Sequence, residues 1–525
     1  MSGRKVGLLL LILAFGATVE TAWNVRGDVR LGPEGCRVMS GRFYGPSYSF
    51  EQTDERRVAA APRLEVRNAF GDVRVSAGAT GLVKVKLRKV VYLAAEDKAR
   101  SFAGGVELRL SGDGQPLRIG TNRDEVDRRE AVGFETHLEI EAPADAVVAV
   151  RNEHGRVDLS GVSAADVTSS FEGVTIEGVA GDVKLESRNG DVTVRGVGGT
   201  LDLSSRHGGV EASSLARPAK LDVQHGDLNV RDAAALEIAQ QFGGVTAERV
   251  AGDLVVRAGH SEVHGSDVRG RADVETTFSG VHLARVGGSV RAKAEHGLVN
   301  AEDVAGGVVA QSSFDGVELE RVGGPAEVEV QHGHVTLKGL AQGARVRASG
   351  GDVQLEGFTG AVDVELERGN AQLSPRAAIG APVSVSVTHG EAHLEIPTGS
   401  RVEIEAESRR GDVEVENVEG FARTEGDRSE HGPGHHVKGS TAAGGSLVRL
   451  RADGDVGVKG SSAEKIADEP IAAPTRAGAQ DAPAPRPVEA TPTPVVPAKP
   501  AAKAKPAAAR AEEAPEAKPQ SEPTP

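Results

Sequence analysis

The strongest constraint on the fold is a repeat of eighteen residues. Apolar residues return at one position of this repeat from Val174 to Val353, and only one of the ten steps is seventeen residues long. A second apolar or small residue follows two positions later in each unit, so the periodicity inside the unit is that of a β-strand. Self-similarity at a short fixed period indicates stacked units. The first series consists of Val174, Val192, Val210, Leu228, Val245, Val263, Val281, Val299, Val317, Val335 and Val353.

The length of the unit selects one kind of stack. Eighteen residues are too few for a strand–helix–strand crossover, which takes about 30 residues or more. They fit one coil of a β-solenoid, in which each strand pairs with its copies in the neighbouring coils, about 4.8 Å away. Glycines return at one corner, where tight turns need their conformational freedom. The sequence therefore predicts an all-β, single-stranded parallel β-helix over residues 64–460, most regular over 154–420, with about fifteen coils and a length of roughly 70 Å.

Composition agrees with a thin, elongated core. The chain has 525 residues but only 3% aromatic residues and two methionines, so its apolar content is mostly Val, Ala and Leu. The net charge of −15 argues against nucleic acid as a partner, because phosphate contacts need a basic surface. Cys36 is the only cysteine, which excludes an intrachain disulfide and a cysteine-based metal site within one chain.

One column of the repeat alternates between His and Phe. Its members are in phase with inward positions, such as Val274 and Thr276 before Phe278, so we expect the rings to point inward and stack about 4.8 Å apart. Buried histidines are mostly neutral, which predicts loss of stability in acid. A shared metal would need several ligand nitrogens about 2 Å from one ion, which rings in separate coils do not supply. The predicted structural ladder is His207, His225, Phe242, His260, Phe278, His296, Phe314 and His332.

The two ends of the chain differ from the repeat. In residues 1–23, Arg4 and Lys5 precede an apolar stretch, which predicts a signal peptide or a retained N-terminal membrane anchor. Residues 24–60 hold an aromatic cluster that we expect to cap the solenoid, with a recognition surface as the alternative. Residues 461–525 are rich in Pro, Ala, Lys and Glu, so we expect a disordered tail.

No catalytic, cofactor or metal site is predicted. Residues 425–440, with His431, His435 and His436, are expected to form a loop. Calcium-binding β-rolls need paired glycine- and aspartate-rich loops, which are missing at nearly every corner. The aspartates that follow corner glycines are instead expected to bind backbone groups of the turns. These aspartates are Asp72, Asp182, Asp191, Asp253, Asp352, Asp412 and Asp455.

The phrases FGDVRVSAG, FEGVTIEGVAGDVKLESRNGDVTVRGV and RRGDVEVENVEG carry a resemblance to a known family. They are similar to the bacterial putative-adhesin domain, a β-helical domain of unknown function, and the resemblance covers about residues 64–460. It implies an exported, envelope-associated β-helix, usually right-handed, and it brings no catalytic motif with it.

The functional hypothesis is a non-enzymatic adhesin or structural scaffold in the periplasm or at the cell surface. Its expected partner is an envelope glycan or another cell-surface polymer, and its solenoid ends offer strand edges for self-association. The alternative is a carbohydrate-active β-helix enzyme of the polysaccharide lyase or hydrolase type. Such an enzyme would need carboxylates clustered where the repeat is interrupted, near residues 90–135 or 420–440.

Overall fold

A computed structural model describes residues 46–112, 116–126, 132–426 and 435–461 of the chain. Nearer the N-terminus it gives only the backbone of a small antiparallel sheet, formed by β1 (Arg30–Leu31), β2 (Cys36–Met39) and β3 (Arg42–Tyr44). The described residues belong to the first of two units, Met1–Thr475. The predicted signal segment and the predicted tail lie outside the described residues and stay predictions.

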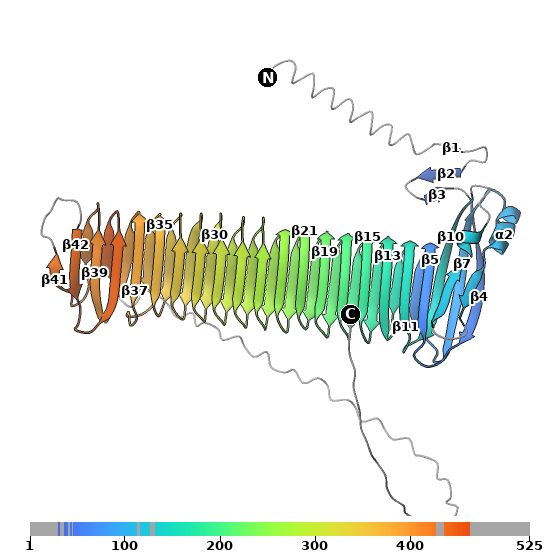
Figure 1. Cartoon of the computed structure of the whole chain (residues 1–525), viewed down its shortest axis with the longest axis horizontal. Coiled ribbons are helices and arrows are strands. Elements are labelled where there is room, and N and C mark those ends of the chain that lie inside the picture. The colour runs from blue at the N-terminus through green and yellow to red at the C-terminus, as the bar shows by residue number, and fades with distance from the viewer. Residues whose placement is uncertain are drawn as a thin grey trace, which may run out of the picture. The chain divides into compact units, whose positions relative to one another are not determined.

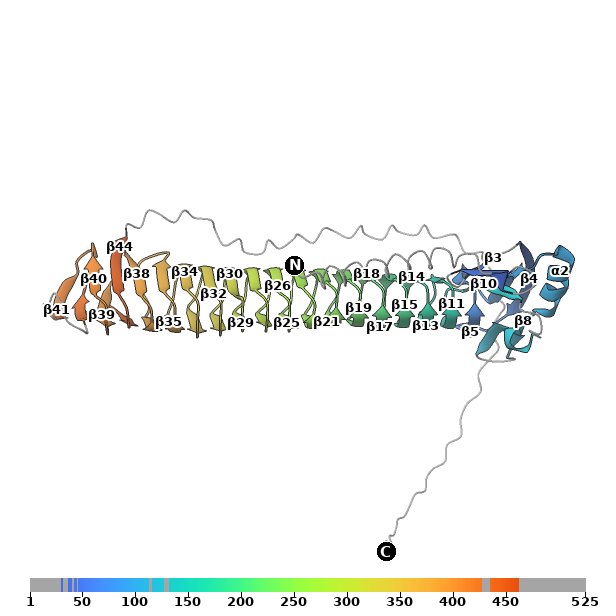
Figure 2. The same ribbon diagram turned by 90° about the horizontal axis from the view of Figure 1, so that it is seen from above.

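Two long parallel sheets lie face to face along the stack, as Figures 1 and 2 show. Each coil contributes one strand to each sheet, because its apolar residues alternate with polar ones and turn inward from both sides. We call the sheets even and odd, after the numbers of their strands from β11 to β38. The even sheet contains β12 (Val157–Ser160), β14 (Val174–Val179), β16 (Val192–Val197), β18 (Val210–Leu215), β20 (Leu228–Ala233), β22 (Val245–Val250), β24 (Val263–Val268), β26 (Val281–Val286), β28 (Val299–Val304), β30 (Gly316–Val322), β32 (His334–Leu340), β34 (Val353–Phe358), β36 (Ala371–Pro375) and β38 (Ala392–Pro397).

The odd sheet has the same number of strands over this range, and consecutive strands again pair in parallel. The predicted parallel β-solenoid with coils of about eighteen residues is therefore confirmed. The odd strands are β11 (Val147–His154), β13 (Ala164–Phe171), β15 (Val183–Asn189), β17 (Leu201–His207), β19 (Ala219–His225), β21 (Leu236–Phe242), β23 (Leu254–His260), β25 (Ala272–Thr276), β27 (Val290–Ala294), β29 (Val308–Ser312), β31 (Ala326–Val330), β33 (Ala344–Ala348), β35 (Val362–Arg368) and β37 (Val383–His389).

The core lies between the sheets and is built from columns of identical positions. In the coil of β22 and β23, Val245, Ala247, Val250, Leu254 and Val256 are each at most 1% exposed. The register of the sheets places each such residue against its copy in the next coil, for example Val245 against Val263. The predicted apolar series is thus the core of the solenoid.

The chain turns at two long edges of the stack. At the ring edge an odd strand passes into the next even strand, for example through residues 243–244. At the ion-pair edge an even strand passes into the next odd strand, for example through residues 251–253. At the ion-pair edge the backbones of successive coils approach so closely that a Cβ on Gly288 would lie 2.5 Å from the Gly270 carbonyl oxygen.

The N-terminal end of the stack is closed by antiparallel strands. β4 (Ser47–Arg57) pairs with β7 (Leu82–Tyr92), and β7 pairs with β10 (Gly133–Pro143). β5 (Arg63–Phe70) and β6 (Val73–Gly78) form the first coil, with β8 (Leu108–Ser111) and β9 (Leu117–Thr121) beside β5. The sequence did not predict the helix α2 (Glu96–Gly105), which packs with Tyr48 and Phe50 in a small second core. A short 3₁₀ turn, η2 (Arg123–Glu125), lies where the repeat is interrupted near residues 90–135.

The C-terminal end departs from the order of the sequence. β43 (Ser446–Ala452) lies between β37 and β39 (Val402–Ser408), and β44 (Val456–Ser461) lies between β38 and β40 (Val413–Glu416). Beyond β39 follow β42 (His435–Ser440) and then β41 (Ala422–Gly426). β42 pairs antiparallel with β39 on one side and antiparallel with β41 on the other. The prediction of a loop over residues 425–440 is wrong at both ends. Residues 425–426 belong to β41, and in residues 435–440 Val437 is buried and its strand pairs with β39.

Replacing Gly288 by Ala should lower the free energy of unfolding by about 3 kcal/mol, because the new Cβ has no room beside a rigid backbone carbonyl. Gly244 is the matched control, since a Cβ there would lie 3.6 Å from its nearest neighbour, Asp227 Oδ1. Chemical denaturation of the two variants compares them directly. Equal denaturation midpoints for Gly288→Ala and Gly244→Ala would contradict the close approach of the coils.

Candidate functional site

The His/Phe column forms a continuous stack of rings along the ring edge. From His207 to His332 the ring centroids of neighbours are 4.3–5.8 Å apart, and their planes lie within 29° of each other. This spacing follows from the parallel pairing of successive coils. Four of the rings are the last residues of their strands, and the other four lie just after the end of a strand. The column contains His207, His225, Phe242, His260, Phe278, His296, Phe314 and His332, and we call it the ring ladder.

The predicted inward orientation of the ring ladder is wrong. All eight side chains are exposed, and the three phenylalanines Phe242, Phe278 and Phe314 are 42%, 49% and 51% exposed. The basis for the predicted acid sensitivity, burial of neutral histidines, is therefore absent. Because the ring faces cover one another, the ladder presents ring edges to the solvent.

The error arose from counting alternation across a turn. Thr276 points inward, and its Oγ1 donates a hydrogen bond to the Ser261 carbonyl, 3.1 Å away in the previous coil. In the equivalent position of a later coil, Ser312 Oγ donates to the Gly297 carbonyl at 3.1 Å. These buried polar side chains hold the corner where the chain bends, so the residue two positions later lies outside the bend.

The stacked column begins earlier than the sequence suggested. Phe70, His154 and Phe171 stack at the same position, with centroids 4.6 Å and 4.5 Å apart. Asn189 then occupies one coil before His207. The column thus accepts His, Phe and Asn without a change of backbone pairing.

A second ladder, which the sequence analysis missed, runs along the ion-pair edge. Arg249 donates hydrogen bonds to both carboxylate oxygens of Asp232, at 2.7 and 3.0 Å. Arg285 binds Asp267 in the same way, at 2.7 and 2.9 Å. We call the alternating column the Asp/Arg ladder; it consists of Asp232, Arg249, Asp267, Arg285, Asp303 and Arg321.

The Arg side chains set the protonation of their partners. Hydrogen bonds from Arg249 and Arg285 lower the pKa of Asp232 and of Asp267 below the usual range. The carboxylates therefore stay charged in mildly acidic solution, and the ladder keeps alternating charges.

The Asp/Arg ladder occupies strained backbone. Its residues have φ between 54° and 57°, the left-handed region that favours glycine. Other coils do place glycine at this position, for example Gly178, Gly196, Gly339 and Gly357. Left-handed conformation costs an ordinary residue about 1 kcal/mol or more, while exposed ion pairs stabilise a fold little. Stability therefore does not account for this column.

A shallow groove runs along the outer face of the odd sheet, from β27 to β37. It has a volume of about 650 Å³, and a smaller hollow of about 150 Å³ adjoins it at Gln311 and Arg347. The sequence did not predict the groove, because small residues at the starts of the strands form it rather than long loops. Six successive coils each contribute one such residue: Ser289, Gly307, Pro325, Gly343, Ala361 and Pro382.

The corner aspartates bind the backbone, as predicted. Asp191 Oδ1 accepts a hydrogen bond from the Gly209 N–H at 2.9 Å, and Asp253 Oδ1 accepts one from the Arg271 N–H at 2.8 Å. Asp412 is the exception, since its carboxylate lies 3.5 Å from His435 Nε2. The aspartates that accept from a backbone N–H are Asp72, Asp182, Asp191, Asp253, Asp352 and Asp455.

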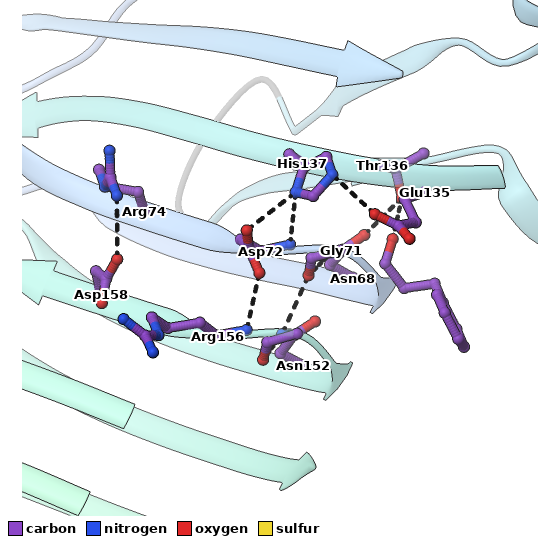
Figure 3. A network of polar contacts seen from close by, with 12 residues as sticks. Asn68, Gly71, Asp72, Arg74, Glu135, Thr136, His137, Asn152, Arg156 and Asp158 are labelled. Carbon is purple, nitrogen blue, oxygen red and sulfur yellow. Dashed lines mark hydrogen bonds and ion pairs between the residues drawn. The ribbon is translucent and has the colours of Figure 1, made fainter. Parts of the chain in front are cut away.

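A partly buried polar network joins the N-terminal strands to the first coil (Figure 3). His137 on β10 lies between two carboxylates, with Nδ1 3.2 Å from Asp72 Oδ2 and Nε2 3.1 Å from Glu135 Oε2. Tyr92 donates a hydrogen bond to the other oxygen of Glu135 at 3.0 Å. Both carboxylates thus bind His137, and Asp72 also accepts the Arg156 N–H at 3.0 Å.

The network has a defined charge state. Burial lowers the pKa of His137, but hydrogen bonds to Asp72 and Glu135 outweigh it and raise the pKa to about 9. Hydrogen bonds from His137 in turn lower the pKa of both carboxyl groups. At neutral pH the network is a cation between two anions, an arrangement that fastens β10 to the first coil.

Metal-binding groups and membrane-spanning helices were sought only among the described residues. In this part of the chain no group of three or more His, Cys, Asp or Glu side chains is placed to hold a metal ion. Within the same ranges no helix is long and apolar enough to cross a membrane. The predicted membrane anchor in residues 1–23 lies outside the described residues, as does His431.

The C-terminal half of the stack has a counterpart among known families. Residues 231–459 match the model of the Toastrack DUF4097 family. The resemblance to a β-helical domain of unknown function is confirmed over residues 231–459. This range contains the whole groove, the whole Asp/Arg ladder and the ring ladder from Phe242 onward. No curated protein matches this chain.

Similar solved structures include proteins from Clostridium and Parabacteroides. A putative cell adhesion protein from Clostridium sporogenes covers 78% of this chain and 100% of its own, with 10% identity and a TM-score of 0.13. A putative adhesin from Parabacteroides distasonis covers 62% and 97%, with 9% identity and a TM-score of 0.15. One from Parabacteroides merdae covers 62% and 95%, with 8% identity and a TM-score of 0.16. Because these values are low, we transfer neither fold nor function from them.

Raising the pH should loosen the N-terminal end of the stack through His137. A histidine whose pKa rises from 6.5 to about 9 on folding stabilises the fold fully below about pH 6.5. That contribution, at most about 3 kcal/mol, is lost as the pH rises through about 9. Thermal unfolding followed by circular dichroism between about pH 7 and pH 10 measures the effect.

The variant His137→Gln should show a smaller decrease in melting temperature over this pH range than the original chain. His282→Gln is the control, because His282 is a partly exposed residue of β26 that stacks on His264 and lies 3.4 Å from Glu262. A pH dependence that His137→Gln leaves unchanged would show that the Asp72–His137–Glu135 network does not fasten the strands.

Proposed function

We propose that this protein is an exported, non-enzymatic scaffold of the cell envelope that adheres to an extended polymer along the outer face of its odd sheet. The polymer class that fits best is an envelope glycan. The observation that carries the proposal is the groove across six successive coils, which runs along the axis of the stack. A repeating surface suits a repeating partner, because many weak contacts add up when they form together.

The lining of the groove suits hydroxyl-rich ligands. Arg291, Glu327, Arg345 and Asp363 line it and offer hydrogen-bond donors and acceptors in alternation. Between them, Pro325 and small residues leave room for the apolar faces of sugar rings. Protein–carbohydrate recognition of this kind needs polar groups that fix orientation above an apolar floor.

The same groove offers little to a hydrolase. A glycosidase needs a carboxylic acid whose environment raises its pKa, so that the acid can protonate the leaving group. Glu327 is exposed to solvent, and Asp363 lies 3.5 Å from the Arg345 guanidinium, so neither carboxylate lies in an apolar, unpaired setting. Near residues 90–135, where the alternative enzyme hypothesis needs free carboxylates, Glu135 is held by His137 and Tyr92.

Export rests on the N-terminal sequence. Two cationic residues before a short apolar stretch are the pattern of a secretory signal. The absence of cysteine pairs does not oppose export, since the long apolar core of the stack needs no crosslink.

The test is binding of the full chain to a glycan array and to purified cell-wall polymers, scored for both retention and breakdown. The double variant Arg291→Ala, Arg345→Ala should weaken binding about tenfold, because it removes two donors from the groove. Lys184→Ala, Lys220→Ala is the matched control, since both lysines occupy the same position of the coil, outside the groove.

Retention that the groove variant lowers and the control leaves unchanged would support the proposal. Breakdown of a polymer would replace the scaffold with an enzyme. Equal binding by the groove variant and the control would place the contact elsewhere on the molecule.

A further inference from the structure

The ring ladder and the Asp/Arg ladder are in step with each other. Both alternate with a period of two coils, and over six successive coils every coil with Phe also carries Arg, while every coil with His also carries Asp. The pairs are His225 with Asp232, Phe242 with Arg249, His260 with Asp267, Phe278 with Arg285, His296 with Asp303, and Phe314 with Arg321.

Contacts within one chain do not set this agreement. Rings stack on rings along the ring edge, while Arg binds Asp along the ion-pair edge. Within a coil, the even strand separates the two columns by five residues or more, about 16 Å. The phase of one ladder relative to the other has a physical consequence where the two edges meet, and they meet when two copies lie side by side.

We propose that copies of this chain associate side by side and in parallel, with the ring edge of one copy against the ion-pair edge of the next, coil for coil. In this arrangement the edge of each Phe ring covers the aliphatic part of an Arg side chain. Each His ring nitrogen faces an Asp carboxylate, to which a ring N–H can donate. The Arg guanidinium keeps its intrachain Asp partner while its methylene groups are covered.

The pairing selects its own register. A shift by one coil would place Phe rings against carboxylates, which lose hydration and gain no partner there. A shift by two coils restores the pairing but loses matched coils, because the flanking coils pair His207 with Ser214 and His332 with Gly339. The unshifted arrangement keeps all six matched coils together.

Exposure and shape allow the contact to form. The Arg249 and Arg285 side chains are 51% and 55% exposed. The rings opposite them, Phe242 and Phe278, are 42% and 49% exposed. Arg321 is less accessible, with 23% of its side chain exposed. Figure 1 shows the same sheet facing the viewer from β11 to β37, so the edges run nearly straight along the stack. Straight edges let weak contacts repeat over many coils and act together.

The strained backbone of the Asp/Arg ladder fits the same role. Glycine is favoured at this left-handed position, and coils outside the matched run use it, as at Gly196 and Gly357. Six successive coils instead carry charged side chains there. A surface that must present charges to a neighbour explains why the easier residue is missing from this run of coils.

The interface joins two different edges, so it does not close on itself. Each copy has one free ring edge and one free ion-pair edge after pairing, and association by the same step continues into a flat layer one stack thick. This assembly uses the long edges, not the solenoid ends, and it is independent of the glycan proposal.

Two variants with residues that the chain itself uses at these positions test the proposal. The ring variant is Phe242→Asn, Phe278→Asn, Phe314→Asn, chosen because Asn189 occupies this column. The ion-pair variant is Arg249→Gly, Arg285→Gly, Arg321→Gly, chosen because Gly178 occupies the column of the Asp/Arg ladder in an earlier coil. Sedimentation velocity of the full chain should show concentration-dependent growth, which both variants lose while their circular dichroism spectra stay unchanged.

Mixing the variants gives the decisive result. A mixture of ring variant and ion-pair variant retains one intact pair of edges, so it should form heterodimers and nothing larger. Phe171→Asn, in the same column but opposite no Arg, should assemble like the original chain. A monomeric original chain, variants that still assemble, or a mixture without heterodimers would each overturn the proposal.

Crosslinking tests direction and register. In a Cys36→Ser background, Phe242→Cys should form disulfides with Arg249→Cys on another copy, and Phe314→Cys with Arg321→Cys. A preference of Phe242→Cys for Arg321→Cys would indicate antiparallel copies and overturn the parallel arrangement.

Discussion

Parallel pairing between successive coils is the interaction on which the rest of the structure depends. Each strand forms main-chain hydrogen bonds with the equivalent strands of its neighbours, so every side chain lies directly above its own copy. One residue choice thus becomes a column, and a column is what the core, the ring ladder, the Asp/Arg ladder and the groove have in common. Main-chain pairing requires only that each column be tolerable, which means apolar inside and small at the tight corners.

This constraint explains what could be predicted from the sequence. The eighteen-residue period, the apolar columns such as Val245 to Val263 and the corner aspartates all follow from strict repetition, which a sequence displays openly. The stacking of the rings also followed from it, whereas their direction did not. Strand alternation holds only inside a strand, and the bend after Thr276 shifts Phe278 to the outside.

Other features left weaker signals. The Asp/Arg ladder stands directly before an apolar column and looks like ordinary surface charge until its left-handed backbone is seen. The groove arises from small residues such as Gly307 and Ala361, which the sequence shows only as corner positions. The His137 network joins residues that are 65 positions apart, Asp72 and His137, and no periodic pattern connects them. Repetition predicts repeated features well and leaves single ones undetected.

The function that emerges is one of extended surfaces. Apart from the network that fastens its first coil, the described molecule concentrates its unusual chemistry in columns that run the length of several coils. A groove on one sheet offers a polymer a path along the stack, and two edges with matching periods offer a second copy a place to align. The two surfaces are neighbours, because the groove begins at the starts of the odd strands, next to the ion-pair edge that carries the Asp/Arg ladder.

The order of the last coils has a consequence for how the molecule is completed in time. β39 and β40 precede β43 and β44 in the sequence, but they reach the stack only through them. Growth from the N-terminus can therefore proceed coil by coil only as far as β38. After that, about forty residues must wait until the final coil has been made and has docked. The C-terminal end of the stack therefore forms in a single late step. In a chain truncated before residue 446, the stack would end at β37 and β38, and the segment that contains β39 and β40 would have no strand of the stack to pair with.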